Sequence, residues 1–212
     1  QSSVTELKHI FHTGSHNTPQ TFTFDSRPET VKAKDGLTSA EKGTLLHLIM
    51  SQVDLTADIT MSYLKDLSAE LEAKEYIDSG VVGQISLEGV LSFYQSSLGQ
   101  RLIAAQPDQR YRELPFIVAL DSHSVNPDLP KGEKSILVQG IIDCLWREED
   151  GWVLVDYKSD HIRPHQTNLL MERYSGQIAL YRYAVEQILK EPVKESYFYL
   201  TSTGMMVKVE SV

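Results

Sequence analysis

The stretch 135–158 limits the possible folds most, because it holds two strand-like segments separated by a short turn. Residues 135–147 and 152–158 are rich in β-branched and aromatic side chains, which favour pleated strands. Between them, 148–151 read Glu-Glu-Asp-Gly, a composition typical of a turn. The sequence therefore predicts an antiparallel hairpin and, with it, a β-sheet.

The register of this hairpin decides which charged side chains meet. If 148–151 form the loop, Asp143 lies directly opposite Asp156, with Cβ atoms about 4.5–5.5 Å apart. Lys158 follows two residues after Asp156 and points to the same face. Like charges directly opposite destabilise a sheet, so this register predicts a bridging cation or a shared proton. Removing one carboxylate is then expected to relieve repulsion.

A second register is also compatible with the sequence. If only Asp150 and Gly151 form the loop, Asp143 lies opposite Lys158. The two would then form an ordinary cross-strand ion pair without a metal. The spacing alone leaves both registers open.

Helices are expected on both sides of this hairpin in the chain. Thr38 and Glu41 form a capping-box pattern that predicts a helix running to about residue 53. Further helices are predicted over 58–76 and 84–106, the latter broken near Gly99. The other expected elements are a strand over 111–120, a helix over 168–190, and a closing hairpin of 195–200 and 205–209. Strands interleaved with helices indicate an α/β fold with a mixed sheet.

Composition excludes several classes of protein. The chain has 20 Lys and Arg against 29 Asp and Glu, a net charge of −9, which excludes holding nucleic acid by bulk electrostatic attraction. One cysteine, Cys144, rules out a disulfide framework and a self-contained iron–sulfur cluster. The absence of a G-x-x-x-x-G-K-[ST] motif excludes a P-loop ATP site in this piece.

The ends and the hydropathy of the chain add expectations about its context. No apolar run approaches the roughly 18 residues that cross a bilayer, and no signal peptide opens the chain. We therefore expect a cytoplasmic protein without a membrane partner. Because the first residue is Gln1 and not Met, we also expect a piece of a longer polypeptide.

Outside the hairpin, three groups of polar residues are candidates for a site. His47 lies one helical turn after Gly43, whose small size leaves backbone access beside an imidazole that could bind a metal; a structural histidine is the ordinary alternative. Tyr174, Gln177 and Tyr181 share one helix face and could contact phosphates or bases, or form a half-buried aromatic seam.

The loop after the second hairpin strand is the third group. Arg163 lies in it, beside His161 and His165. Arg163 could contact phosphates of a nucleic acid, although an ordinary polar loop explains it as well.

Five motifs occur in the order seen in RecB-family nucleases of the PD-(D/E)XK superfamily. They are Gly43-Thr-Leu-Leu-His47, Arg112-Glu113-Leu-Pro-Phe116, Gly140-Ile-Ile-Asp143, Val155-Asp156-Tyr157-Lys158-Ser159 and Tyr174-x-x-Gln177-x-x-x-Tyr181. The opening 3–8 also resembles the entry to the C-terminal nuclease domain of AddA (RexA) subunits. The four-Cys iron–sulfur set of AddB and Cas4 relatives is missing, which favours the AddA type.

The resemblance implies an architecture. It implies a restriction-endonuclease-like α/β fold, a mixed β-sheet flanked by helices, with a helical subdomain inserted after the first core helix. A single nuclease domain would span 1–212. Within it, 13–37 would be a mobile connection, 54–106 the helical insertion, and 107–212 the catalytic sheet and helix.

The resemblance also implies roles for single residues. The implied metal ligands are His47, Asp143, Asp156 and the backbone carbonyl of Tyr157. Lys158 would position the attacking water or stabilise the phosphate in the transition state. The remaining implied site residues are Glu113, which would help assemble the metal site, and Gln177 and Tyr181, which would support the site and the DNA strand.

These donors suit Mg²⁺, with Mn²⁺ as a substitute, because carboxylates and imidazole bind such cations. The expected function is a metal-dependent DNA exonuclease domain of a bacterial helicase–nuclease that processes double-strand breaks. Its expected partners are DNA, delivered as a single strand by the motor, the helicase part of the same chain, and a second subunit of the AddB/RexB type. The alternatives are a non-catalytic DNA-binding or assembly module of the same complex, and a hydrolase of a small phosphate ester.

Overall fold

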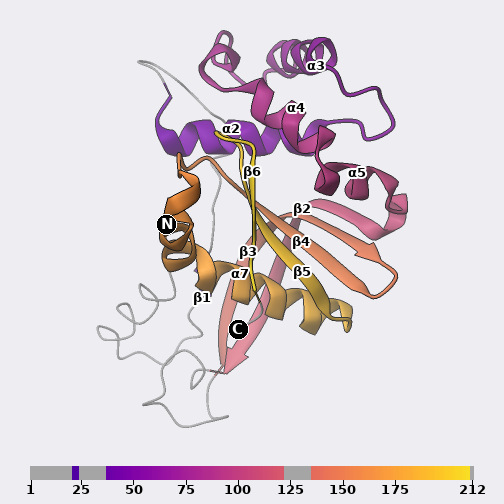
Figure 1. The fold of residues 1–212 in the computed structure, drawn as a ribbon, viewed down its shortest axis with the longest axis vertical. Coiled ribbons are helices and arrows are strands. Elements are labelled where there is room, and N and C mark those ends of the chain that lie inside the picture. The colour runs from indigo at the N-terminus through magenta and orange to yellow at the C-terminus, as the bar shows by residue number, and fades with distance from the viewer. Residues whose placement is uncertain (1–20, 24–36, 122–134, 211–212) are drawn as a thin grey trace.

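A mixed β-sheet forms the centre of the molecule (Figure 1). The computed structural model describes residues 21–23, 37–121 and 135–210. Six strands are found in these residues: β1 (Thr21–Thr23), β2 (Arg110–Asp121), β3 (Ser135–Glu148), β4 (Gly151–Lys158), β5 (Val193–Leu200) and β6 (Met205–Lys208). The order is β1-β3-β4-β5-β6, and β2 pairs with β3 as well. The pairs β1–β3 and β4–β5 are parallel and the other pairs are antiparallel, which confirms the expected mixed sheet.

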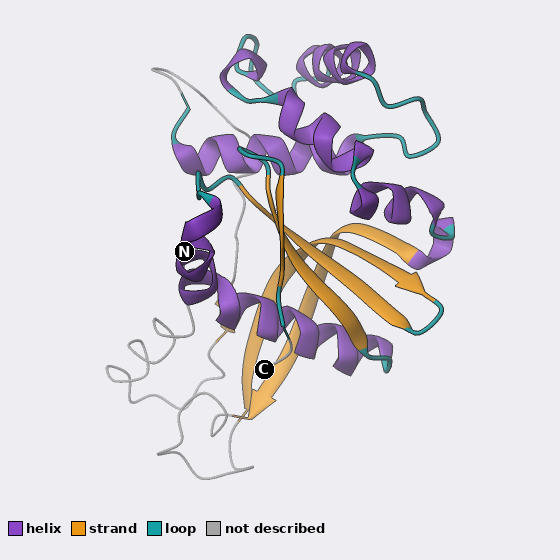
Figure 2. Cartoon of the chain, viewed as in Figure 1, coloured by secondary structure: helices purple, strands orange, loops and turns teal. Residues whose placement is uncertain are grey.

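Helices cover both faces of the sheet (Figure 2). The α-helices are α2 (Ser39–Gln52), α3 (Met61–Ala73), α4 (Leu87–Gln95), α5 (Ser97–Ala104) and α7 (Thr167–Leu189). Short 3-10 turns lie at Val82–Gln84, Pro107–Gln109 and Pro164–Gln166. Helices α3 to α5 stand between α2 and β2 in the chain, where a helical insertion was expected.

Side-chain caps explain where the helices begin. The Thr38–Glu41 capping box forms as predicted, and Thr60 and Ser86 accept a backbone N–H at the starts of α3 and α4. The expected break near Gly99 is misplaced, because Ser96 separates α4 from α5 as the N-cap of α5. Gly99 lies inside α5, where an added Cβ would be 2.1 Å from the carbonyl oxygen of Phe93.

Two hydrophobic cores lie on opposite faces of the sheet. In β4, Val153, Val155 and Tyr157 pack in the core of α2 to α5, whereas Trp152 and Leu154 pack in the core of α7. A strand buried on both faces reads as a continuous apolar run, as the β4 sequence does. The sheet therefore lies between the two hydrophobic cores and contributes side chains to both.

Strands β2 and β3 change faces partway along their length. Ile142 packs in the α7 core, but Cys144, two residues later, packs in the core on the α2 side. In β2, Leu114 packs against the α7 core while Arg112 donates hydrogen bonds to carbonyls at the end of α2. Residues two apart on a regular strand share a face, so both strands are irregular here. The irregular residue in β2 is Glu113, whose φ is +56°.

Some expectations concern residues outside the described part of the chain. The short element expected at 1–12 and most of the connection expected at 13–37 lie there. Thr21–Thr23, inside that connection, form β1, a strand that the sequence did not predict. The hairpin of β5 and β6 forms as expected, with Gly204 at φ +71° in its turn. Within the described residues, every helix is too short or too polar to cross a membrane.

Candidate active site

The hairpin of β3 and β4 adopts the register that brings two aspartates together. Arg147 pairs with Trp152, and the last backbone pair toward the site is Cys144 with Val155. Asp143 and Asp156 are the next positions along, as the first of the two predicted registers requires. The connecting loop is shorter than expected, because Glu148 and Gly151 also pair. The alternative register, with Asp143 opposite Lys158, is wrong.

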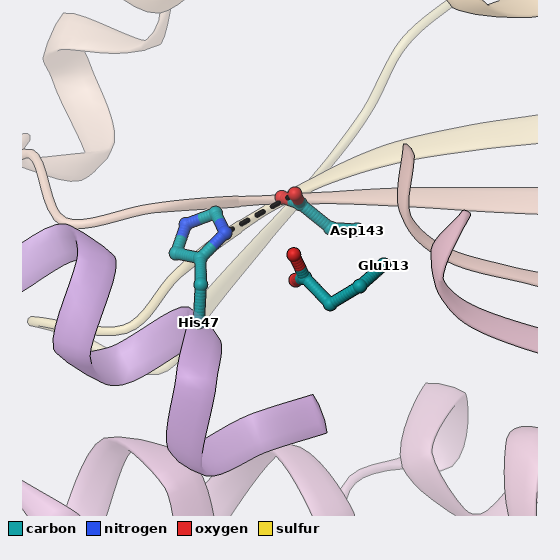
Figure 3. A group of neighbouring side chains, drawn as sticks. All are labelled: His47, Glu113 and Asp143. Atoms are coloured by element: carbon teal, nitrogen blue, oxygen red, sulfur yellow. Dashed lines mark hydrogen bonds and ion pairs between the residues drawn. The ribbon is translucent and has the colours of Figure 1, made fainter. Parts of the chain in front are cut away.

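Asp143 joins three elements through its two carboxylate oxygens. Oδ1 lies 3.1 Å from Nδ1 of His47 on α2 (Figure 3). Oδ2 accepts the backbone N–H of Tyr157 on β4 at 2.6 Å. The other ring nitrogen of His47, Nε2, lies 3.1 Å from the Tyr157 carbonyl oxygen. Asp143 and His47 are both buried, so these contacts form away from solvent.

Close packing of α2 against the end of β4 holds His47 at this depth. A Cβ added to Gly43 would lie 3.3 Å from Oγ of Ser159, which is tighter than an ordinary contact. At the other end of α2, Arg112 donates to the carbonyl oxygens of Met50 and Val53. These carbonyls have no partner within the helix, so the arginine caps its C-terminus. The helix that carries His47 is therefore fixed at both ends.

Glu113 completes a group of three possible metal ligands. One ligand atom each of His47, Glu113 and Asp143 lies within 4.8 Å of the other two (Figure 3). Glu113 reaches this position from a left-handed backbone conformation, which is uncommon for a residue with a side chain. Such strain persists only where the surrounding structure enforces it, and it clusters at functional sites.

Asp156 is fully buried beside this group but is not part of it. Its Oδ2 lies 2.7 Å from Nζ of Lys158. Burial raises the pKa of Asp156 to about 6, Lys158 opposes that rise, and the charge of Asp143 adds to it. The group of neighbouring ligand atoms therefore includes Glu113, while Asp156 lies beside it and is paired with the lysine. The ligand set expected from the sequence, His47, Asp143, Asp156 and the Tyr157 carbonyl, stays a prediction.

Lys158 is held between β4 and α7. Its Nζ donates to Oε1 of Gln177 at 2.8 Å, and Nε2 of Gln177 donates to the hydroxyl of Tyr181 at 2.8 Å. Tyr181 is completely buried, so it supports Gln177 from the interior. Tyr174 places its ring 4.3 Å from Nζ of Lys158. Arg163 is exposed in the loop between β4 and α7.

Two residues at the site were not identified from the sequence. Asp160 accepts the hydroxyl of Tyr174 at 2.9 Å, and Arg112 caps α2 as described above. Arg112 stands next to Glu113 inside a motif, which was an available signal. No periodicity pairs Asp160 with Tyr174, because one lies in a loop and the other on a helix.

The donor set fits a divalent cation. Two carboxylates and an imidazole nitrogen within a few ångströms match the ligands preferred by Mg²⁺ and Mn²⁺. The carboxylates of Glu113 and Asp143, the second of them buried, also repel each other at this distance unless a positive charge lies between them. Among the residues that the structure describes, this is the one group of three or more His, Cys, Asp or Glu side chains whose ligand atoms lie within 4.8 Å of one another.

Comparison with known proteins agrees with this geometry. The chain is 35% identical over 212 residues to the A-type subunit of the ATP-dependent helicase/nuclease from Thermoanaerobacter sp. (strain X514), covering 97% of this chain and 17% of that protein. It is 38% identical over 224 residues to the protein of the same name from Bacillus mycoides (strain KBAB4), covering 99% and 18%. These matches confirm the AddA-type resemblance, and the chain spans less than a fifth of the length of these relatives.

A family model covers nearly all of the described residues. The model described as the PD-(D/E)XK nuclease superfamily matches residues 23–211. That range includes the hairpin of β3 and β4, the helix that carries His47, and α7. The chain therefore belongs to the PD-(D/E)XK nuclease superfamily.

Proposed function

We propose that this chain is a metal-dependent DNA exonuclease domain of a bacterial helicase–nuclease that processes double-strand breaks for recombinational repair. The observation that carries the proposal is the meeting of His47 on α2 with Glu113 and Asp143 on the sheet, with ligand atoms within 4.8 Å of one another, next to the strand that carries Lys158. A structural cluster would need no lysine held at its edge by a separate helix. A metal-dependent phosphodiesterase can use both, because the cluster would hold the cation and the lysine would offset negative charge on the phosphate.

Mg²⁺ or Mn²⁺ would be held by His47, Glu113 and Asp143, with Asp156 and the Tyr157 carbonyl next to them. When bound, such a cation lowers the pKa of a water molecule bound to it and offsets the negative charge of the phosphate oxygens. Asp143 keeps the site assembled, because it contacts both His47 and the backbone of Tyr157. The buried setting excludes bulk water, which strengthens each electrostatic contact.

Lys158 supplies a fixed positive charge at the reacting phosphate. An ammonium cannot ligate a metal, but it can hold hydroxide or offset the negative charge that develops on phosphate. Asp156 and Gln177 hold it at 2.7 and 2.8 Å. Arg163, exposed in the loop between β4 and α7, would contact the DNA backbone.

The wider biological role is proposed from the relatives. Their name describes one subunit of a helicase/nuclease. The helicase part of a longer chain would bind ATP and deliver a DNA strand to this domain, and a second subunit of the AddB/RexB type would complete the complex in the cytoplasm. Delivery by a motor also accounts for an acidic nuclease domain, because a net charge of −9 gives little attraction for DNA by itself.

Cleavage of labelled single-stranded DNA tests the proposal. The chain is incubated with a linear oligonucleotide, with a circular single strand, and with Mg²⁺, Mn²⁺ or EDTA. We expect metal-dependent loss of the linear strand, resistance of the circle, no cleavage by Asp143→Asn, and strongly slowed cleavage by Lys158→Ala. Cleavage that continues in EDTA would contradict the metal site, and cutting of the circle would contradict exonuclease action.

The same assay separates the alternative functions. Binding of the strand without cleavage in either metal would identify a DNA-binding or assembly module. Hydrolysis of a small phosphate ester with no effect on DNA would identify a hydrolase of another class. The role in the complex is tested by joining the chain to its helicase part, which should make degradation of linear duplex depend on ATP.

A further inference from the structure

Tyr174 and Asp160 form a connected pair beside Lys158 that the catalytic roles above leave without a function. The ring of Tyr174 lies 4.3 Å from Nζ of Lys158, within the range of a cation–π interaction. The hydroxyl of the same tyrosine donates to Oδ2 of Asp160 at 2.9 Å. Tyr174 therefore contacts the Lys158 ammonium with the face of its ring and the Asp160 carboxylate with its hydroxyl group.

The rest of the surroundings shows how this pair is kept in place. Oδ1 of Asp160 accepts a hydrogen bond from Nη1 of Arg173 at 3.0 Å. The backbone carbonyl of Asp160 accepts a hydrogen bond from the hydroxyl of Ser202 at 2.7 Å. Tyr174 is 8% exposed, and its ring lies 6.0 Å from that of Phe198 in the α7 core. The tyrosine has little freedom to rotate and little surface to offer a nucleic acid.

Lysine needs such support more than the other site residues. Its four-carbon stem is flexible and its ammonium has three rotatable donors, so the groups packed around it decide where the charge lies. Asp156 and Gln177 accept two of these donors, at 2.7 and 2.8 Å. The face of Tyr174 covers a further side of the ammonium without accepting a conventional hydrogen bond.

We propose that Tyr174, held by Asp160, is a positioning residue that fixes Lys158 for catalysis and does not itself contact DNA. The aromatic face attracts the ammonium and limits its rotamers, while the Asp160 hydrogen bond fixes the plane of the ring. This assignment rests on the proposed nuclease function, and it replaces the interpretation of Tyr174 as a base or phosphate contact. It also gives Asp160 and Arg173 a shared role in orienting the ring.

A kinetic experiment uses three variants of the chain and a matched control. Tyr174→Leu removes the ring, Tyr174→Phe keeps the ring and removes the hydroxyl, and Asp160→Asn weakens the acceptor. Tyr183→Leu changes an exposed tyrosine of the same helix and serves as the control. We expect kcat on single-stranded DNA to fall about tenfold for Tyr174→Leu and about threefold for the other two, with KM unchanged. Tyr183→Leu should behave as the parent.

A double-mutant cycle shows whether the effect passes through the lysine. In a Lys158→Ala background, Tyr174→Leu should cause no further loss of kcat, because the group it positions is gone. Combining Tyr174→Phe with Asp160→Asn should cost little more than Tyr174→Phe alone, since both changes act on the same hydrogen bond. Additive losses would overturn the proposal, and so would a rise in KM with kcat unchanged, which is the signature of a DNA contact.

A spectroscopic measurement tests the contact without any nuclease activity. In protein with ¹³C-labelled lysine, the ring of Tyr174 should shift the ε-CH₂ signal of Lys158 upfield. Tyr174→Leu should remove this shift, whereas Tyr174→Phe and Asp160→Asn, which act on the same hydrogen bond to the ring, should reduce it to a similar extent. A Lys158 signal at the position of an exposed lysine in the parent protein would overturn the proposal. An inactive parent that keeps the shifted signal would contradict the proposed function alone.

Discussion

The carboxylate of Asp143 accepts the backbone N–H of Tyr157 at 2.6 Å, one step beyond the last paired residues of β3 and β4. A side chain thus continues the connection between the strands where backbone pairing stops. The same carboxylate contacts His47 with its other oxygen. The residue expected to bind the metal is also the residue that holds the site together before any metal arrives.

We therefore predict that Asp143→Ala lowers stability as well as abolishing cleavage. Repulsion between Asp143 and Asp156, considered alone, predicts that the variant is more stable, because one of two like charges is removed. The structure adds a buried N–H that would lose its acceptor, at a cost of about 1–3 kcal/mol. Urea unfolding without metal measures the change. Asp143→Asn, which retains an acceptor oxygen, should lose less stability, and an Ala variant as stable as the parent would contradict this interpretation.

Lys158→Ala should slow cleavage by roughly 10²–10³-fold, the usual cost of losing one preorganised electrostatic donor. Mn²⁺ affinity should stay the same or rise slightly, because a nearby positive charge disappears. Lys158→Arg should restore activity only in part, since the guanidinium is larger and planar and does not match the ammonium site. Single-turnover cleavage and calorimetric Mn²⁺ titration measure the two effects separately. Normal turnover by Lys158→Ala would remove this residue from the reaction.

Glu113 offers a test that separates ligation from backbone strain. Glu113→Ala and Glu113→Gly should both weaken Mn²⁺ binding, since each removes a carboxylate from the group with His47 and Asp143. The Gly variant should be more stable than the Ala variant by about 1 kcal/mol, because φ of +56° suits glycine. Calorimetry and urea unfolding give the two quantities. Equal stability of the two variants would mean that the left-handed conformation relaxes on substitution.

Glu148 should make stability depend on acid pH. Its hydrogen bonds with Arg101 lower its pKa from 4.5 to about 2, with smaller contributions from Lys194 and Trp146. A lowered folded-state pKa stabilises the fold fully above about pH 4.5, and this contribution is lost as the pH falls toward 2. Unfolding midpoints at pH 3 and pH 7 should differ less in Glu148→Gln than in the parent. The exposed neighbour Glu149, changed to Gln, is the control and should leave the difference intact.

The close approach of α4 to the β5–β6 turn gives a prediction about the helical insertion. A Cβ added to Gly89 would lie 2.0 Å from the backbone carbonyl oxygen of Thr201, so the helix must move away. Gly89→Ala should destabilise the chain by about 1–3 kcal/mol, the usual range for overpacking. Gly83→Ala, at a position with open space around it, should be close to neutral. Thermal or urea unfolding of the two variants makes the comparison.

Much of the fold could be predicted because local chemistry determines it. The Thr38–Glu41 capping box starts α2, and the turn between β3 and β4 sets the register that places Asp143 beside Asp156. Both depend on residues a few positions apart, so their spacing carries the information. Motif order, in turn, identified the superfamily that the family model matches.

Other features depended on residues that are distant in the sequence. Strand β1 forms by pairing with β3, more than a hundred residues away, and three residues alone carry no clear pattern. The break between α4 and α5 lies at Ser96, because Gly99 is needed for close packing on the Phe93 carbonyl. Such positions are decided by backbone contacts that no local periodicity records.

The candidate active site also combines features that the sequence predicted with features that depend on distant contacts. The sequence alone determined that His47, Asp143, Asp156 and Lys158 belong to one site, through motif order and the period of a strand. Only the tertiary structure decided that a carboxylate oxygen of Glu113 lies within 4.8 Å of ligand atoms of His47 and Asp143, while Asp156 pairs with Lys158. This arrangement goes with the left-handed conformation of Glu113 and with the change of faces in β2 and β3. The sequence did not indicate either feature, because a regular strand period keeps residues two apart on one face.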